Sequence, residues 1–153
     1  MAALCAVVFG IVAGMRSMLA PCAMSWAVWM GILDVGKTPI AFMGYRYTHI
    51  IFTALAAGEL IADKLPFISS RKAAGPFIAR IVSGALCGAT IGAARDSMLV
   101  MAVLGAAGAV LGTLGGAAAR AKLATVFGRD LPAALLEDCV GIAMAAFCIQ
   151  ALR

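Results

Sequence analysis

Apolar residues fill most of the chain in long runs that charged residues interrupt only at intervals. A helix needs about 20 predominantly apolar residues to cross the hydrocarbon core of a bilayer. Four runs are suited to such a helix: residues 48–65, 73–94, 97–119 and 131–152. The pattern therefore predicts a transmembrane helix in each run, with short loops between them.

The first apolar run, residues 2–33, is too long for one plain helix and too short for two full crossings. It is interrupted by Gly14, Arg16 and Ser17, and Pro21 follows. Serine can cap a new helix, and proline is tolerated in a first turn. We predict a helix that is broken here or re-enters the side it came from. The alternative is one long kinked helix whose arginine extends to the membrane surface.

Composition strengthens the membrane assignment. Hydrophobic residues make up 64% of the chain and charged residues 12%, against about 45–50% and about 25% in soluble domains. So few polar side chains cannot cover a small soluble domain. The long runs also differ from the alternating segments of a membrane β-barrel. We predict an all-α, polytopic transmembrane bundle of about five helices, forming one domain over residues 1–153.

The net charge of +5 comes from basic residues spread singly over short loops, with no basic stripe. This distribution suits anionic lipid headgroups and argues against nucleic acid. The connections at 66–72, counted with Lys64, and at 120–130 hold more Lys and Arg than the other two. By the positive-inside rule we expect these two connections to face the cytoplasm.

Glycines recur at intervals of four in two of the predicted helices. They are Gly84, Gly88 and Gly92 in one helix, and Gly108, Gly112 and Gly116 in the next. Each set lines one helix face and lets another backbone approach closely. With a tight turn at Arg95 and Asp96, we expect an antiparallel hairpin with Gly84 and Gly108 at similar depth. The faces pack that hairpin or join two protomers, and we expect a homo-oligomer.

Ionisable residues inside membrane helices are costly and need a partner, a water-filled cavity or a function. The candidates are Glu59, Asp63, Arg80, Glu137 and Asp138, with Arg16 and Ser17 at the break in the first run. If the helices alternate across the membrane, these charges share one depth. Glu59 and Asp63 also share one helix face, because they lie four residues apart.

Three interpretations of these charges remain open. In the first, Glu59 and Asp63 bind a cation or a proton, Arg80 tunes them electrostatically, and the carboxylates of the last helix close the site. In the second, the charges form an ion-pair network that stabilises the bundle. In the third, the arginines and the helix that begins near Ser17 hold a lipid phosphate or a carboxylate.

Two stretches of the chain echo each other. Arg16-Ser17-Met18-Leu19 is similar to Arg95-Asp96-Ser97-Met98-Leu99, and Glu59 has counterparts in Glu137 and Asp138 at nearly the same offset. A real repeat means two three-helix units of inverted topology, an arrangement found in secondary transporters. Matches this short also arise by chance in a chain rich in Ala, Leu and Gly.

Catalytic and metal-binding patterns are missing from the sequence. There is no H-E-x-x-H, no G-x-S-x-G and no phosphate loop. The single histidine, His49, follows Tyr45 and Tyr47 and is expected in an interfacial aromatic belt. The five cysteines lie in apolar stretches without a C-x-x-C pair. We expect no catalytic residue, no metal site and no cofactor.

Several motifs resemble one bacterial integral-membrane family, catalogued as a domain of unknown function. They are G-E-L-I-A-D-K-L-P at 58–66, Ser70-Arg71, I-A-R-I-V-S-G-A-L at 78–86 and G-x-R-S-M-x-A-P at 14–21. The resemblance implies a small multi-pass protein of the bacterial cytoplasmic (inner) membrane. It brings no activity with it, but it places its most specific motif around Glu59 and Asp63.

The sequence leads to a ranked expectation for function. We expect binding or transport of a small solute or ion through the buried carboxylates and arginines. A structural or accessory membrane protein, whose charges only pair with one another, is the alternative. A membrane-embedded enzyme acting on lipid ranks third.

Overall fold

The computed structural model describes residues 1–62, 74–127 and 130–153. The elements in order are α1 (Ala2–Met15), α2 (Leu19–Trp29), the short 3₁₀ helix η1 (Ala41–Gly44), α3 (Thr48–Ala62), α4 (Ala74–Ala93), α5 (Met98–Phe127) and α6 (Asp130–Leu152). This part of the chain contains no β-strand. The predicted all-helical fold is confirmed.

Three helices, α4, α5 and α6, are long and apolar enough to cross a membrane. The remaining predicted crossing, residues 48–65, corresponds to α3. This helix has 15 described residues, which are too few to cross a membrane. Residues 63–65 of that predicted crossing lie outside the described residues. Within the described part of the chain, the length criterion is therefore met by three of the four predicted crossings.

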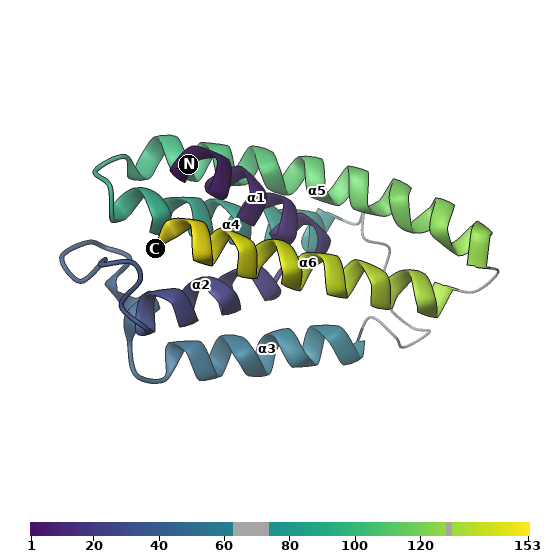
Figure 1. Ribbon diagram of the computed structural model, residues 1–153, viewed down its shortest axis with the longest axis horizontal. Helices are drawn as coiled ribbons and strands as arrows, with labels where there is room; N and C mark the ends of the chain where they lie inside the picture. Colours follow the sequence, from purple (N-terminus) through teal and green to yellow (C-terminus); the bar gives the residue numbers. More distant parts are fainter. Residues whose placement is uncertain (63–73, 128–129) are drawn as a thin grey trace.

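The first apolar run is broken, as predicted, and the single kinked helix is wrong. Arg16 has an extended backbone, with φ −140° and ψ 108°, between the end of α1 and the start of α2. In Figure 1, α1 runs inward from the end of the bundle marked N, and α2 runs back toward the same end. Pro21 lies in the first turn of α2, where its missing N–H is not needed.

The predicted loop at residues 120–130 is wrong over most of its length, because α5 continues to Phe127. Residues 117–127 include alanine, lysine and leucine, which favour helix, and no glycine or proline that would end one. The helix has 30 residues. Its extension places Arg120 on a helix next to α6 instead of in a loop.

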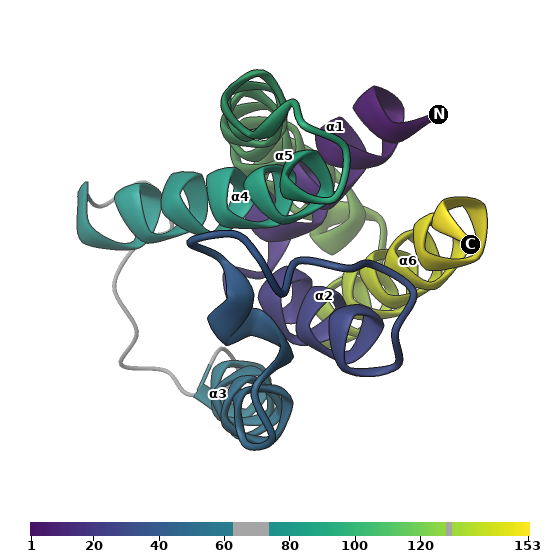
Figure 2. The ribbon, with the colours of Figure 1, turned by 90° about the vertical axis from the view of Figure 1, so that its left-hand side faces the viewer.

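Helix α1 occupies the centre of the bundle, where it packs against α4, α5 and α6. Phe9, Val12 and Ala13 on this helix are fully buried. Figure 2 shows α4 and α5 on one side of the molecule and α3 at the opposite edge, beyond α2. Helix α3 packs chiefly against α2 and η1, and only His49 and Ala56 on it are buried. It is the most peripheral helix of the bundle.

The first glycine face packs α4 against α5. The turn between these two helices contains Asp96, whose backbone is left-handed (φ 52°). A methyl group on Gly84 would lie 2.6 Å from the Gly105 carbonyl oxygen and 2.8 Å from Ala109 Cβ. A methyl group on Gly92 would lie 2.7 Å from Met98 Cα. Gly84 therefore lies at the depth of residues 105–109, as expected for the predicted hairpin.

The second glycine face packs against α1 instead of α4. A methyl group on Gly108 would overlap the Val7 carbonyl oxygen, and one on Gly112 would overlap the Ile11 carbonyl oxygen. Gly10 and Gly14 of α1 approach α5 equally closely. Because helices of the same chain cover both glycine faces, an oligomer would need a different surface.

Candidate polar site at the helix break

Glu59 reaches from α3 to the break between α1 and α2. One carboxylate oxygen accepts hydrogen bonds from the Ser17 backbone N–H (2.8 Å) and the Ser17 hydroxyl (2.7 Å). The other accepts from the Met18 backbone N–H (2.8 Å). Amides at a helix start have no partner within the helix, and the helix dipole favours negative charge there. The Glu59 carboxylate therefore supplies the anion for the start of α2.

Arg16, at the same break, forms an ion pair with Asp138 of α6. Its Nε lies 2.7 Å and a terminal guanidinium nitrogen 2.6 Å from one Asp138 carboxylate oxygen. Arg16 is 1% exposed and Asp138 is 7% exposed. A buried pair of this kind must stay together, because either charge alone would be strongly unfavourable. The pair fixes α6 to the end of α1.

A second charged pair lies beside the break, between α5 and α6. A guanidinium nitrogen of Arg120 lies 3.6 Å from a Glu137 carboxylate oxygen. Both residues line a cavity of about 150 Å³, whose other walls are apolar and include Met15 at the end of α1. The sequence interpretation missed Arg120, because it assigned this residue to a loop. The absence of a helix breaker in 117–127 was the signal that places it on a helix.

Thr113 of α5 also contributes to the break and was not predicted. Its hydroxyl lies 3.2 Å from the Gly14 carbonyl oxygen and 2.8 Å from the Ala109 carbonyl oxygen. The Gly14 carbonyl belongs to the last turn of α1, where carbonyl groups lack partners within the helix. Thr113 is 1% exposed, so it supplies a buried polar partner for the end of α1.

The structure thus brings together five predicted site residues at one place: Arg16, Ser17, Glu59, Glu137 and Asp138. Arg80 is buried in α4, with 5% exposure. Asp63, predicted beside Glu59, lies outside the described residues. The hydrogen-bond donors to Glu59 are backbone amides and a hydroxyl group at the break. The sequence instead predicts arginines as the groups that balance its charge.

The contacts of the two echoing stretches differ. Glu59 binds the turn between α1 and α2, whereas Glu137 and Asp138 contact Arg120 and Arg16. The counterpart turn, between α4 and α5, lies at the end of the bundle away from the start of α6 (Figure 1). The helices of the two halves do run in opposite directions (Figure 1), as an inverted repeat requires. The repeat stays a prediction.

No protein-family model, curated protein or solved structure matches the chain. The fold and the site therefore define only a class: a helical bundle with three helices long and apolar enough to cross a membrane, and with charged residues gathered at a break in its N-terminal segment. Within the described residues, no group of three or more His, Cys, Asp or Glu side chains is placed to hold a metal ion.

The Ser17 hydroxyl offers a small, local test of this geometry. We expect Ser17→Ala to destabilise the protein by about 1.5 kcal/mol, because it removes a hydrogen bond to a charged acceptor and leaves the two backbone bonds in place. Unfolding by SDS titration in mixed micelles measures the change. Ser17→Thr keeps the hydroxyl and is the control. Equal loss in both variants would show that the hydroxyl is not bonded to Glu59.

Proposed function

We propose that the chain is a small multi-pass membrane protein that binds a small ion or solute at the helix break and moves it across the bilayer. The observation that carries this proposal is the convergence of Glu59 and the Arg16–Asp138 pair on a helix break inside an otherwise apolar bundle. Broken helices whose half-helix ends face charged groups are characteristic of transporter binding sites.

The length of α1 supports a location within the bilayer. Its 14 residues span about 21 Å at about 1.5 Å per residue, less than the hydrocarbon thickness of about 30 Å. Because α1 and α2 turn back toward the same end (Figure 1), this pair would enter the bilayer and leave by the same side. The break, with Glu59, would then lie inside the membrane.

In this proposal, Glu59 is the group that binds and releases the proton or other cation. Its carboxylate holds the start of α2 only while it is negatively charged and free to accept three hydrogen bonds. When it binds a proton or another cation, those bonds weaken, and α3 becomes free to move relative to α2. The peripheral position of α3 makes such a movement easier than one of α1, which is packed on several sides. Asp63 and Arg80 are the further charged residues that this proposal includes.

The other charges have positioning roles in the same proposal. Arg16 and Asp138 keep the break and α6 together, and Glu137 with Arg120 closes the site beside the cavity between α5 and α6. We place the ends of α3 and α5, which point toward the same end of the bundle in Figure 1, on the cytoplasmic side of a bacterial inner membrane. The proposed partners are membrane lipids and a second copy of the chain.

A structural or accessory role is the second candidate, and a specific observation favours it. Each carboxylate described at the break already faces a donor: Glu59 the helix amides, Asp138 the buried Arg16, and Glu137 the Arg120 side chain. A fully paired set of charges can serve stability alone. In that case Glu59 would only join α3 to the break.

Glu59→Gln separates the two candidates. In liposomes, the transport proposal predicts a flux of protons or of ⁸⁶Rb⁺ through the wild type that the variant loses, because the neutral amide no longer exchanges a cation. Asp34→Asn, which changes an exposed carboxylate in the loop before α3, is the matched control and should keep the flux. Flux equal to that of empty liposomes for all three proteins, with lowered stability of Glu59→Gln, would contradict transport of these ions and favour the structural role.

A further inference from the structure

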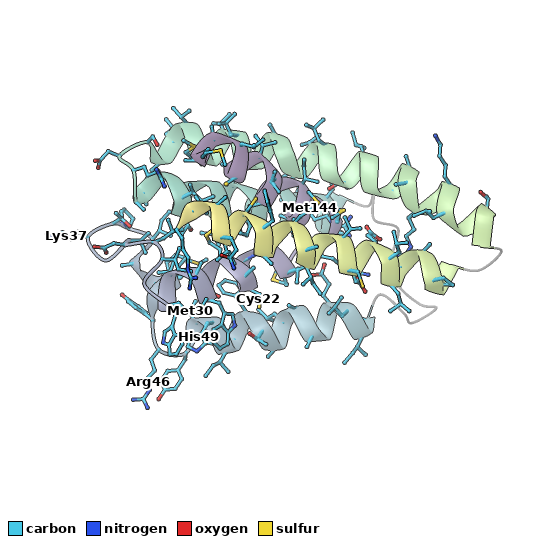
Figure 3. All side chains as sticks on the ribbon, viewed as in Figure 1. Cys22, Met30, Lys37, Arg46, His49 and Met144 are labelled. Atoms are coloured by element: carbon cyan, nitrogen blue, oxygen red, sulfur yellow. The ribbon has the colours of Figure 1, made fainter. Side chains whose placement is uncertain are left out.

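His49 lies in the first turn of α3 and packs against the two tryptophans of α2, whose own ring centres are 5.5 Å apart. The centre of its imidazole ring is 4.6 Å from the ring centre of Trp26 and 4.6 Å from that of Trp29. His49 is 5% exposed. Trp29, Tyr45 and Tyr47 are exposed, but His49, which was expected in an interfacial belt, is buried. Figure 3 labels it at the end of the bundle where the loop before α3 lies.

One nitrogen of this ring is buried without a partner. His49 Nδ1 has no hydrogen-bond partner among the described residues. The polar groups around it are already engaged: the Trp26 indole N–H donates to Thr53 Oγ1 (3.0 Å), and the Thr53 hydroxyl donates to the His49 carbonyl (2.6 Å). Buried polar atoms are rarely left unpaired, and each such atom calls for an explanation.

We propose that His49 is a proton-binding site and that its protonated form clamps α3 onto α2. Histidine is the side chain that changes charge most readily between pH 5 and 8. A positive imidazolium is attracted by the faces of adjacent indole rings, and both of its nitrogens are donors. Because Nδ1 is engaged in no hydrogen bond, protonation there breaks none. In this proposal the attraction of the two indole rings outweighs the cost of burying the charge, so that the proton strengthens the contact between His49 and the two tryptophans.

Few other ionisable groups face this cluster. Helix α3 packs chiefly against α2 and η1. Cys22 is the only ionisable side chain in α2, and η1 has none. In the turn before α3, Tyr45 and Tyr47 are exposed, and exposed Arg46 lies 5.7 Å from the Tyr47 ring centre and projects outward (Figure 3). On α3 itself, Glu59 is ten residues away, about 15 Å along the helix. The indole rings thus provide the main attraction for the charge.

With this clamp, α3 is attached to α2 at two points, one through a positively charged group and one through a negatively charged group. At its start, His49 holds α2 best when protonated. Near its other end, Glu59 holds the start of α2 when deprotonated. The two attachments of α3 therefore use opposite charges, a cation at its start and a carboxylate near its other end. This inference does not require the proposed transport function, since it concerns only the contact between α2 and α3.

The single histidine and the two tryptophans allow a direct test in detergent micelles. We expect tryptophan emission to fall reversibly, as a one-proton transition, between pH 8 and pH 5, because imidazolium quenches an indole that it touches. His49→Phe keeps an aromatic ring and should abolish the transition, whereas Asp34→Asn, which changes an exposed carboxylate in the loop before α3, should retain it. Constant wild-type emission over this range, or the same transition in His49→Phe, would overturn the proposal.

Labelling the protein with ¹⁵N-histidine gives a second readout that needs no variant. The one histidine then contributes all imidazole signals, and their shifts distinguish the neutral from the charged ring. We expect the ring to become charged between pH 8 and pH 5. A ring that is still neutral at pH 5 would overturn the proposal whatever the fluorescence shows. Either result leaves the flux experiment on Glu59 independent, because that experiment concerns a different residue.

Discussion

Replacing Arg16 by methionine should destabilise the protein by about 3–5 kcal/mol, because the change leaves the Asp138 carboxylate without its buried partner. Arg16 is the largest fully buried side chain among the described residues, and it lies within 2.7 Å of that carboxylate. Unfolding by SDS titration in mixed micelles measures the loss. Arg46→Met, which removes an exposed arginine, should stay within about 0.5 kcal/mol of the wild type.

The double variant Arg16→Met/Asp138→Leu distinguishes a lost ion pair from lost packing. Removing both charges leaves neither member of this pair alone, so we expect most of the stability to return. A double variant as unstable as Arg16→Met alone would show that Arg16 acts through its other contacts. A loss below about 1 kcal/mol in the single variant would contradict the buried pair itself.

Gly112→Leu has the second large expected effect, with a loss of about 3 kcal/mol from overpacking. Even the first carbon of the new side chain would overlap the Ile11 carbonyl oxygen. Because that atom belongs to the backbone of α1, the whole helix must move away from α5. Since α1 also supports the Arg16–Asp138 pair, the damage should extend to the site at the break. Thermal unfolding in micelles measures the effect.

Gly115 provides a matched control on the same helix. A methyl group there meets nothing within 4 Å, so Gly115→Leu should be neutral or slightly stabilising, because leucine favours helix more than glycine does. Similar unfolding temperatures for Gly112→Leu and Gly115→Leu would contradict the close approach of α1 and α5.

The arrangement of helices follows largely from the sequence, because apolar runs and glycine spacing are local patterns. The break at Gly14 to Ser17 was predictable for the same reason: it combines a glycine, a charge and a capping residue. The end of α5 differs from the prediction, because Arg120 and Lys122 resemble loop charges in the sequence but lie on the helix, which continues to Phe127. A continuous stretch without glycine or proline was the better guide there.

The partners of the charged residues were harder to predict. Spacing placed Glu59, Glu137, Asp138 and Arg16 at one depth, but it did not say which would pair. That choice depends on how α3 and α6 approach the break, which is a property of tertiary packing. Glu59 binds backbone amides, and a sequence does not indicate which amides will be left unpaired. The inward position of His49 likewise depends on the two tryptophans of α2.

Native mass spectrometry of the detergent-purified protein, beside its Glu59→Gln variant, tests the central claim most directly. It records the number of protomers and the mass of any small molecule that remains bound. We predict a small bound mass on the wild type that Glu59→Gln has lost while its protomers stay folded. A wild type without any bound mass, beside a variant that falls apart, would contradict a binding site at the break and assign Glu59 to stability alone.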